Sequence, residues 1–191
     1  MLVGSGLILT AAHCLDYDSD TGAGITLGDS PVVEIETADG TKLKTTPWVI
    51  ESVCDVALLG PLDSQAFSKQ VRALEGFCRR TKSVPIFRGV VSERPLPVLI
   101  RSHQKKWIKG DVTLLGSSAH RVELEAEEQI VGGTSGGPIV THDGTLVGIV
   151  SHCTEAPQGD VCEGLIPMAH LTLPVWASDL ISKPRFEGYE D

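Results

Sequence analysis

Three short motifs in this sequence carry residue types that could activate a nucleophile. They are Leu9-Thr10-Ala11-Ala12-His13-Cys14, Cys54-Asp55-Val56-Ala57-Leu58-Leu59 and Gly132-Gly133-Thr134-Ser135-Gly136-Gly137-Pro138-Ile139. A serine hydroxyl is a weak nucleophile at neutral pH, so it needs an imidazole to take its proton and a carboxylate to fix the tautomer of that imidazole. His13, Asp55 and Ser135 match these roles in that order, and we expect them to form a catalytic triad.

The glycines around Ser135 predict a second part of the site. A tetrahedral oxyanion is stabilised by two backbone N–H groups that point into one small space beside the nucleophile. Gly133 can adopt a backbone conformation that a residue with a Cβ would resist. We therefore expect the N–H groups of Gly133 and Ser135 to form an oxyanion hole.

The elements that must position these residues are predicted to be mainly strands. Short segments rich in Val, Ile, Leu and Thr alternate with Gly, Pro, Asp and Ser, a spacing typical of a β-barrel or sandwich. The predicted strands are 2–9, 31–37, 43–50, 96–101, 111–115, 121–126, 138–140 and 145–151. Asp143-Gly144 predicts a tight hairpin turn, because these residues tolerate positive φ.

Two further segments have a helical pattern. Residues 64–75 could form a short helix or part of a long connection. Residues 174–182 are predicted as a helix, with Thr172 as a possible cap and Pro174 in the first turn, where its missing N–H costs nothing.

The three motifs resemble those of the trypsin/chymotrypsin-like serine proteases. LTAAHC is similar to the family's histidine motif, DVALL to its aspartate motif, and GGTSGGPIV followed by LVGIVS to its serine motif and the next strand. The resemblance implies an all-β fold of two packed six-stranded antiparallel barrels with a short C-terminal helix. It places a peptidase domain at 1–182 and a polar tail at 183–191. The first barrel would span about 1–75, the second about 84–172, and the helix 174–182.

The resemblance also implies substrate-binding positions and a polypeptide substrate. The segment after LVGI, here Ser151-His152-Cys153, would pair with the substrate backbone. Gln129, six residues before the nucleophile, would lie at the base of the primary specificity pocket. His152 could instead line that pocket and favour an acidic side chain, as in glutamyl endopeptidases.

Several residues depart from the pattern of the secreted trypsins. Thr134 stands where those enzymes carry an Asp that pairs with a freshly cleaved N-terminus. Val3-Gly4-Ser5-Gly6 lacks the Cys that normally partners the thiol beside the histidine, so we expect Cys14 to be free or differently paired. These features look more like the high-temperature-requirement and bacterial glutamyl endopeptidase branches. The chain also begins where the family's second strand would run, so we expect an incomplete first barrel.

The remaining cysteines suggest a disulfide more than a metal site. Cys153 and Cys162 could close a short loop in an oxidising compartment. A metal site with His152 and His170 is disfavoured, because the spacing lacks a paired Cys-x-x-Cys form. We expect no metal and no organic cofactor.

Composition and charge argue against several other classes of function. The 191 residues carry a net charge of −9, which opposes non-specific binding to nucleic acid or to an anionic membrane. Lys105-Lys106 with Trp107 is therefore interpreted as a solvated turn. The sequence shows no secretory signal and no apolar run of the roughly 18 residues that a membrane span needs, which indicates a soluble protein. It leaves the compartment and the oligomeric state open.

Three alternatives remain beside a serine endopeptidase. The same fold could be a catalytically silent peptide-binding module, or an esterase that uses the same triad. The Gly-x-Ser-x-Gly letters also fit the nucleophile elbow of α/β-hydrolases, but Gly136-Gly137-Pro138 is poor material for the helix that must follow there.

Overall fold

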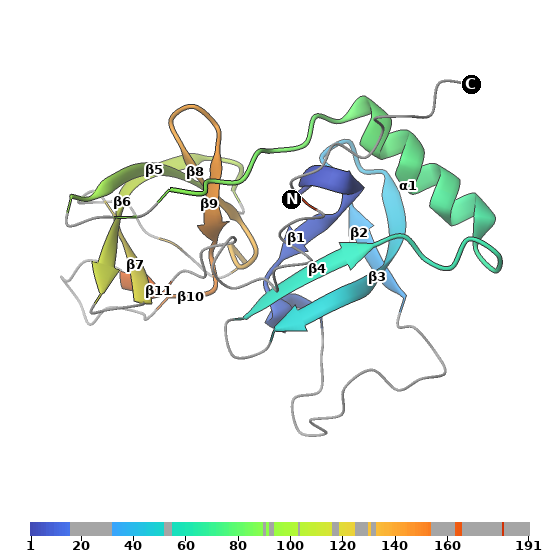
Figure 1. Cartoon of the computed structure of the whole chain (residues 1–191), viewed down its shortest axis with the longest axis horizontal. Helices are drawn as coiled ribbons and strands as arrows, with labels where there is room; N and C mark the ends of the chain where they lie inside the picture. The colour runs from blue at the N-terminus through green and yellow to red at the C-terminus, as the bar shows by residue number, and fades with distance from the viewer. Residues whose placement is uncertain are drawn as a thin grey trace.

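The computed structural model describes residues 1–15, 32–51, 55–89, 91, 94–102, 104–115, 119–124, 130, 133–153, 163–165 and 181. Within them the chain forms two antiparallel sheets and one α-helix, with the sheets packed side by side (Figure 1). The all-β fold class is confirmed. The described residues place four strands in the first sheet and seven in the second, where six in each barrel were expected.

The first sheet has its most buried strand at its centre. The strand order is β1-β4-β3-β2. Its strands are β1 (Ile8–Thr10), β2 (Val33–Glu36), β3 (Lys42–Glu51) and β4 (Val56–Gly60). Every residue of β4 is buried, because neighbouring side chains point to opposite faces and both faces are covered. Leu58 faces the second sheet, whereas Leu59 faces the helix.

That helix is α1 (Ser68–Arg80), which covers the far side of the first sheet (Figure 1). Leu74 and Cys78 on its buried side pack against Leu43 and Leu59. The segment predicted at 64–75 is therefore a helix, but its bounds differ. It starts later because the Asp63 carboxylate accepts a hydrogen bond of 2.8 Å from the Gln65 nitrogen and holds a turn. It ends later because Cys78 continues the apolar stripe at helical spacing.

The second sheet contains the predicted strands of the C-terminal half. Its order is β10-β11-β7-β6-β5-β8-β9. The strands are β5 (Leu96–Arg101), β6 (Trp107–Leu115), β7 (Ala119–Leu124), β8 (Pro138–Thr141), β9 (Leu146–Ile149), β10 (His152–Cys153) and β11 (Glu163–Leu165). Alternate residues such as Val98, Ile100 and Val112 fill its own core.

The strand predicted over 2–9 is wrong at its start. The chain turns back through a 3-10 helix, η1 (Gly4–Gly6), so that Leu2 bridges Ile8 and β1 begins only there. Gly6 has φ of 67°, a conformation that favours glycine. A Cβ on Gly4 would lie 1.6 Å from the carbonyl oxygen of Ile181, so only glycine permits this close approach.

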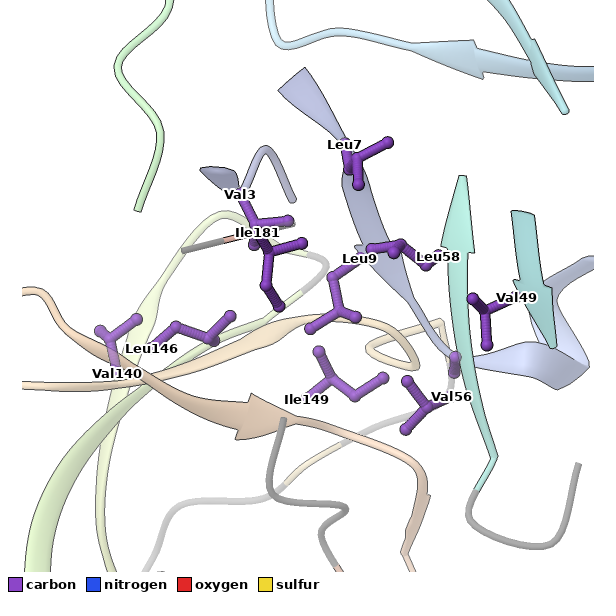
Figure 2. Close-up of a cluster of buried hydrophobic side chains, with 11 residues drawn as sticks. Val3, Leu7, Leu9, Val49, Val56, Leu58, Val140, Leu146, Ile149 and Ile181 are labelled. Atoms are coloured by element: carbon purple, nitrogen blue, oxygen red, sulfur yellow. The ribbon is translucent and has the colours of Figure 1, made fainter. Parts of the chain in front are cut away.

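A shared apolar core joins the two sheets. Leu9, Val56 and Leu58 from the first sheet meet Leu146 and Ile149 from the second (Figure 2). Full burial of such side chains contributes about 1.5–3 kcal/mol each. Residues of the two sheets that contact one another outside this core are therefore held in fixed positions relative to one another.

The connection after α1 also ties the sheets together. The Val84 nitrogen donates a hydrogen bond of 3.1 Å to the Leu2 carbonyl, on the side of the first sheet. The Phe87 nitrogen donates one of 2.7 Å to the Leu146 carbonyl in β9. One extended segment thus bonds to both halves of the molecule.

The Asp143-Gly144 turn is confirmed, and the first sheet contains a second copy of it. Both turns have the sequence Thr-x-Asp-Gly-Thr: Thr37, Asp39, Gly40 and Thr41 in one, Thr141, Asp143, Gly144 and Thr145 in the other. In each, the glycine has positive φ and the aspartate carboxylate accepts bonds from the first threonine hydroxyl and the last threonine nitrogen. The same five-residue pattern therefore encodes the same turn twice.

The C-terminal predictions lie almost entirely outside the described residues. Of the helix expected at 174–182 only Ile181 is described, and it packs into the core between the sheets. The tail at 183–191 is outside as well. In the described part of the chain, no helix is long and apolar enough to cross a membrane.

Candidate active site

His13 is positioned by the strand pairing of the first sheet. Thr10 of β1 pairs with Ala57 of β4, which brings the residues after β1 next to the residues before β4. His13 lies there in a short 3-10 helix, η2 (Ala12–Leu15), and its side chain is 41% exposed. The Ala12 nitrogen donates a hydrogen bond of 3.2 Å to the Asp55 carbonyl.

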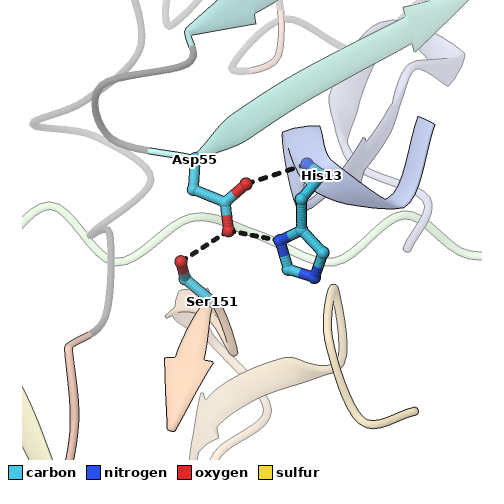
Figure 3. Close-up of polar contacts among 3 residues, drawn as sticks. All are labelled: His13, Asp55 and Ser151. Atoms are coloured by element: carbon cyan, nitrogen blue, oxygen red, sulfur yellow. Dashed lines mark hydrogen bonds and ion pairs between the residues drawn. The ribbon is translucent and has the colours of Figure 1, made fainter. Parts of the chain in front are cut away.

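Asp55 holds His13 at two points (Figure 3). The His13 backbone nitrogen donates to Asp55 Oδ1 at 2.9 Å, and Nδ1 of the ring lies 2.7 Å from Oδ2. An ionised carboxylate only accepts hydrogen bonds, so Nδ1 carries the proton in this contact. The other ring nitrogen, Nε2, is then left with a lone pair that can take up a proton.

The backbone of Asp55 is in an uncommon conformation. Its φ is 55°, in the left-handed region that few residues other than glycine adopt, although Asp is among those that tolerate it. The side chain is only 12% exposed. Such local strain persists where the surroundings fix it, here by the hydrogen bonds to Ala12 and His13.

Ser151 reaches the same carboxylate from the second sheet. Its hydroxyl donates a hydrogen bond of 2.5 Å to Asp55 Oδ2 (Figure 3). Ser151 is predicted as part of the substrate-pairing segment, and its contact with Asp55 is a feature that the sequence did not predict. One signal was available: a buried carboxylate that leads into an apolar strand needs several donors, and His13 alone supplies only part of them.

These contacts control the ionisation of Asp55. Burial by itself raises the pKa of the carboxyl, but hydrogen bonds from Ser151, from the His13 backbone and from the His13 ring lower it. The net result is a pKa below the ordinary value of 3.8. Asp55 is therefore a carboxylate at neutral pH.

Ser135 lies half-buried in the turn formed by residues 133–137, just before β8. We call this segment the serine turn. Gly133 has φ of 85° and Gly136 has φ of 73°, so the turn uses the freedom of both glycines. The Gly136 nitrogen donates to the Val150 carbonyl at 2.8 Å, and the Val150 nitrogen donates to the Gly137 carbonyl at 2.9 Å. These bonds fix the turn against the segment that leads to Ser151.

The same turn packs against the segment that leads to His13. A Cβ built on Gly136 would lie 2.5 Å from Thr10 Oγ1 and 3.2 Å from the Ala11 nitrogen. Only glycine allows this approach without a shift of the neighbouring backbone. The serine turn and the segment that leads into η2 are therefore neighbours, although 122 positions separate Ser135 from His13 in the sequence.

Several predicted residues lie outside the described part of the chain, namely Gln129, Gly132 and Cys162. For His152 and Cys153 the strand is described but the side chains are not; β10 pairs with β11 through His152↔Leu165. The Cys153–Cys162 disulfide and the specificity role of Gln129 remain predictions. The described residues contain no cluster of three or more His, Cys, Asp or Glu that could hold a metal ion.

Cys14, next to His13, is an exposed free thiol. Partial burial, and then the negative charge of Asp55, raise the pKa of this thiol above its ordinary value. The thiol is therefore protonated at neutral pH, and it is a weaker nucleophile than an ordinary cysteine.

Comparison with known families agrees with the geometry. Residues 1–149, more than half of the chain, match the model of the trypsin-like peptidase domain. The chain therefore belongs to the trypsin-like peptidase family, and its fold is chymotrypsin-like. No curated protein matches it in direct comparison. Membership defines a serine protease-type function on polypeptides; the closer kinship with the high-temperature-requirement and glutamyl endopeptidase branches remains a prediction.

Proposed function

We propose that this protein is a serine endopeptidase that cleaves peptide bonds through an acyl-enzyme on Ser135. The observation that carries the proposal is the hydrogen-bonded chain from Ser151 through Asp55 to His13, packed beside the glycine turn that holds Ser135. This arrangement supports the proposal because an oriented imidazole and an adjacent serine are what a serine nucleophile requires.

In the proposed mechanism, His13 acts first as base and then as acid. Its Nε2 takes the proton of Ser135 Oγ as that oxygen attacks the carbonyl carbon of the scissile bond. The imidazolium then gives the proton to the leaving nitrogen, and the amine half of the substrate departs. Water, activated by the same nitrogen, attacks the acyl carbon and releases the acid, which restores Ser135.

Two groups stabilise the charges that develop. Asp55, whose low pKa keeps it ionised, lies against Nδ1 and favours the imidazolium. The N–H groups of Gly133 and Ser135 receive the oxyanion, and the positive φ of Gly133 supports this role because it turns the backbone N–H in a way that a Cβ would oppose. Loss of one such donor typically costs about 3–4 kcal/mol of transition-state stabilisation.

The acyl half of the substrate would lie along 151–153. Strand β10 pairs with β11 on one edge, and within the described residues its other edge has no partner strand. An extended peptide can add to such an edge through main-chain hydrogen bonds.

Intact-mass analysis after treatment with a fluorophosphonate probe tests the proposal. The probe phosphonylates an activated serine, so we expect one adduct on the wild type and none on Ser135→Ala or His13→Ala. Ser64→Ala, in an exposed turn, serves as the matched control and should keep the adduct. A folded wild type without an adduct would instead support the silent peptide-binding module.

Paired peptide and ester substrates separate the endopeptidase from the esterase. Cleavage of both, each lost in Ser135→Ala, is the expected result. Hydrolysis of esters alone would favour the esterase.

A further inference from the structure

The turn between β5 and β6 presents an arginine stacked on an exposed tryptophan. Arg101, the last residue of β5, pairs directly with Trp107, the first residue of β6. The guanidinium carbon lies 5.2 Å from the Trp107 ring centroid, within the range of a cation–π contact. Trp107 is 49% exposed. The ring thus holds the Arg101 charge in place at the surface.

We give the name basic hairpin to residues 101, 102 and 104–107, because position 103 lies outside the described residues. Its ends are closed by hydrogen bonds from the Ser102 nitrogen to the Lys106 carbonyl at 2.9 Å and from the Lys106 nitrogen to Ser102 Oγ at 3.2 Å. Ser102 is buried, and Lys105 has φ of 61°. Lys105 and Lys106 are exposed, in a turn whose two ends are joined by these hydrogen bonds.

The charges of the basic hairpin are not neutralised within the described part of the chain. No carboxylate there forms an ion pair with Arg101, Lys105 or Lys106. The whole chain nevertheless carries a net charge of −9. A local cluster of positive charge that no described carboxylate neutralises attracts an acidic ligand to that place.

The sheet order places this hairpin beside the serine turn. Strand β8, which follows Ser135, lies between β5 and β9. A Cβ on Gly137 would lie 2.6 Å from the Arg101 carbonyl oxygen, so the end of β5 touches the serine turn. Ser151 follows β9 on the opposite side of β8.

The stacked pair also lies on the sheet face that meets the first sheet. Side chains two positions apart on a strand share a face, so Arg101 lies on the face of Leu99. Leu99 packs against the core between the two sheets. Trp107, directly opposite Arg101, shares this face.

We propose that the basic hairpin binds acidic side chains in the leaving half of the peptide substrate, within about three residues of the scissile bond. The proposal rests on the proposed function, in which the acyl half occupies 151–153. An extended peptide that crosses Ser135 then leaves on the opposite side of β8, where it meets Arg101 and the two lysines. At about 3.3 Å per residue, three extended leaving residues cover roughly 10 Å from the scissile bond.

Acyl transfer to added peptides tests the proposed role of the basic hairpin, first with the wild-type protein. An acyl-enzyme formed from a small ester partitions between water and an added peptide amine, which must bind where the leaving half binds. We expect tri-glutamate amide to capture the acyl group about three- to fivefold better than tri-glutamine amide, and less so at high salt. Arg101→Gln and Lys106→Gln should each reduce the preference. Arg72→Gln, on the exposed side of α1, is the matched control and should keep it.

A binding measurement on Ser135→Ala makes the two proposals separately testable. Tri-glutamate amide should shift the Trp107 indole resonance, assigned with Trp107→Phe, whereas tri-glutamine amide should not. Equal capture of both peptides by an acyl-enzyme would overturn the proposed subsite for acidic side chains and would leave the proposed endopeptidase intact. Failure to form an acyl-enzyme would overturn the endopeptidase, and an unchanged indole resonance would overturn the subsite on its own.

Discussion

The hydroxyl of Ser151, between β9 and β10, donates a hydrogen bond of 2.5 Å to the carboxylate of Asp55, which directly precedes β4. The same oxygen of Asp55 lies 2.7 Å from Nδ1 of His13. The carboxylate that orients the imidazole is therefore itself held by a contact from the other half of the molecule.

Ser151→Ala should destabilise the protein and raise the pKa of Asp55. A hydrogen bond to a charged group contributes about 1.5–3 kcal/mol, so we expect a loss of this size in the free energy of unfolding by urea. Ser151→Thr keeps the hydroxyl and should retain most of the stability. Equal losses in both variants would show that packing, and not the hydrogen bond, is responsible.

Asp55→Asn should remove most of the activity while the fold is retained. An amide in place of the carboxylate can donate to Nδ1, which favours the wrong imidazole tautomer. In a Ser-His-Asp triad this change lowers kcat by about 10⁴-fold. Steady-state kinetics together with circular dichroism would measure both effects. A loss below about tenfold would contradict a role for Asp55 in orienting His13.

Gly136→Ala should be far more damaging than Gly144→Ala. Both glycines have positive φ, 73° and 86°, so alanine is strained at either position. At Gly136 the new Cβ would also meet Thr10 Oγ1 at 2.5 Å, whereas at Gly144 nothing lies within 4 Å. We expect Gly144→Ala to cost about 1 kcal/mol and keep activity, and Gly136→Ala to displace the serine turn and abolish labelling by the fluorophosphonate probe.

A fall in pH should destabilise the wild type more than it destabilises the Asp55→Asn variant. The pKa of Asp55 is lowered in the folded protein, so its contribution to stability is fully present above the ordinary value of 3.8 and is lost as pH falls through the lower, folded-state pKa. Urea unfolding between about pH 6 and pH 3 measures the difference.

Asp39 and Asp143, in the two Asp-Gly turns, also have lowered pKa values and provide a comparison for Asp55. Hydrogen bonds from Thr37 and Thr41 lower the pKa of Asp39 to about 2, and those from Thr141 and Thr145 lower the pKa of Asp143. Asp39→Asn should therefore remove a further part of the acid sensitivity. An Asp55→Asn variant with the same pH dependence as the wild type would contradict the lowered pKa of Asp55.

The sequence alone was sufficient for features with a local cause. The apolar segment 145–151 predicts a strand, and Asp143-Gly144 predicts its turn, because neighbours in the chain decide these conformations. The three motifs indicate the family because each carries its residue type and its flanking strand within a few positions.

Tertiary structure decided the features that depend on approach between distant segments. Gly4 is predicted as part of a strand, but it lies in a 3-10 helix where a Cβ would meet the carbonyl oxygen of Ile181. Lys105-Lys106 is predicted as a solvated turn and both residues are exposed, but only the pairing of β5 with β8 brings Arg101 to the serine turn. Ser151 is 96 positions from Asp55, and only the packing of the two sheets brings its hydroxyl to that carboxylate. Such contacts follow from the burial of a shared core, which no local pattern encodes.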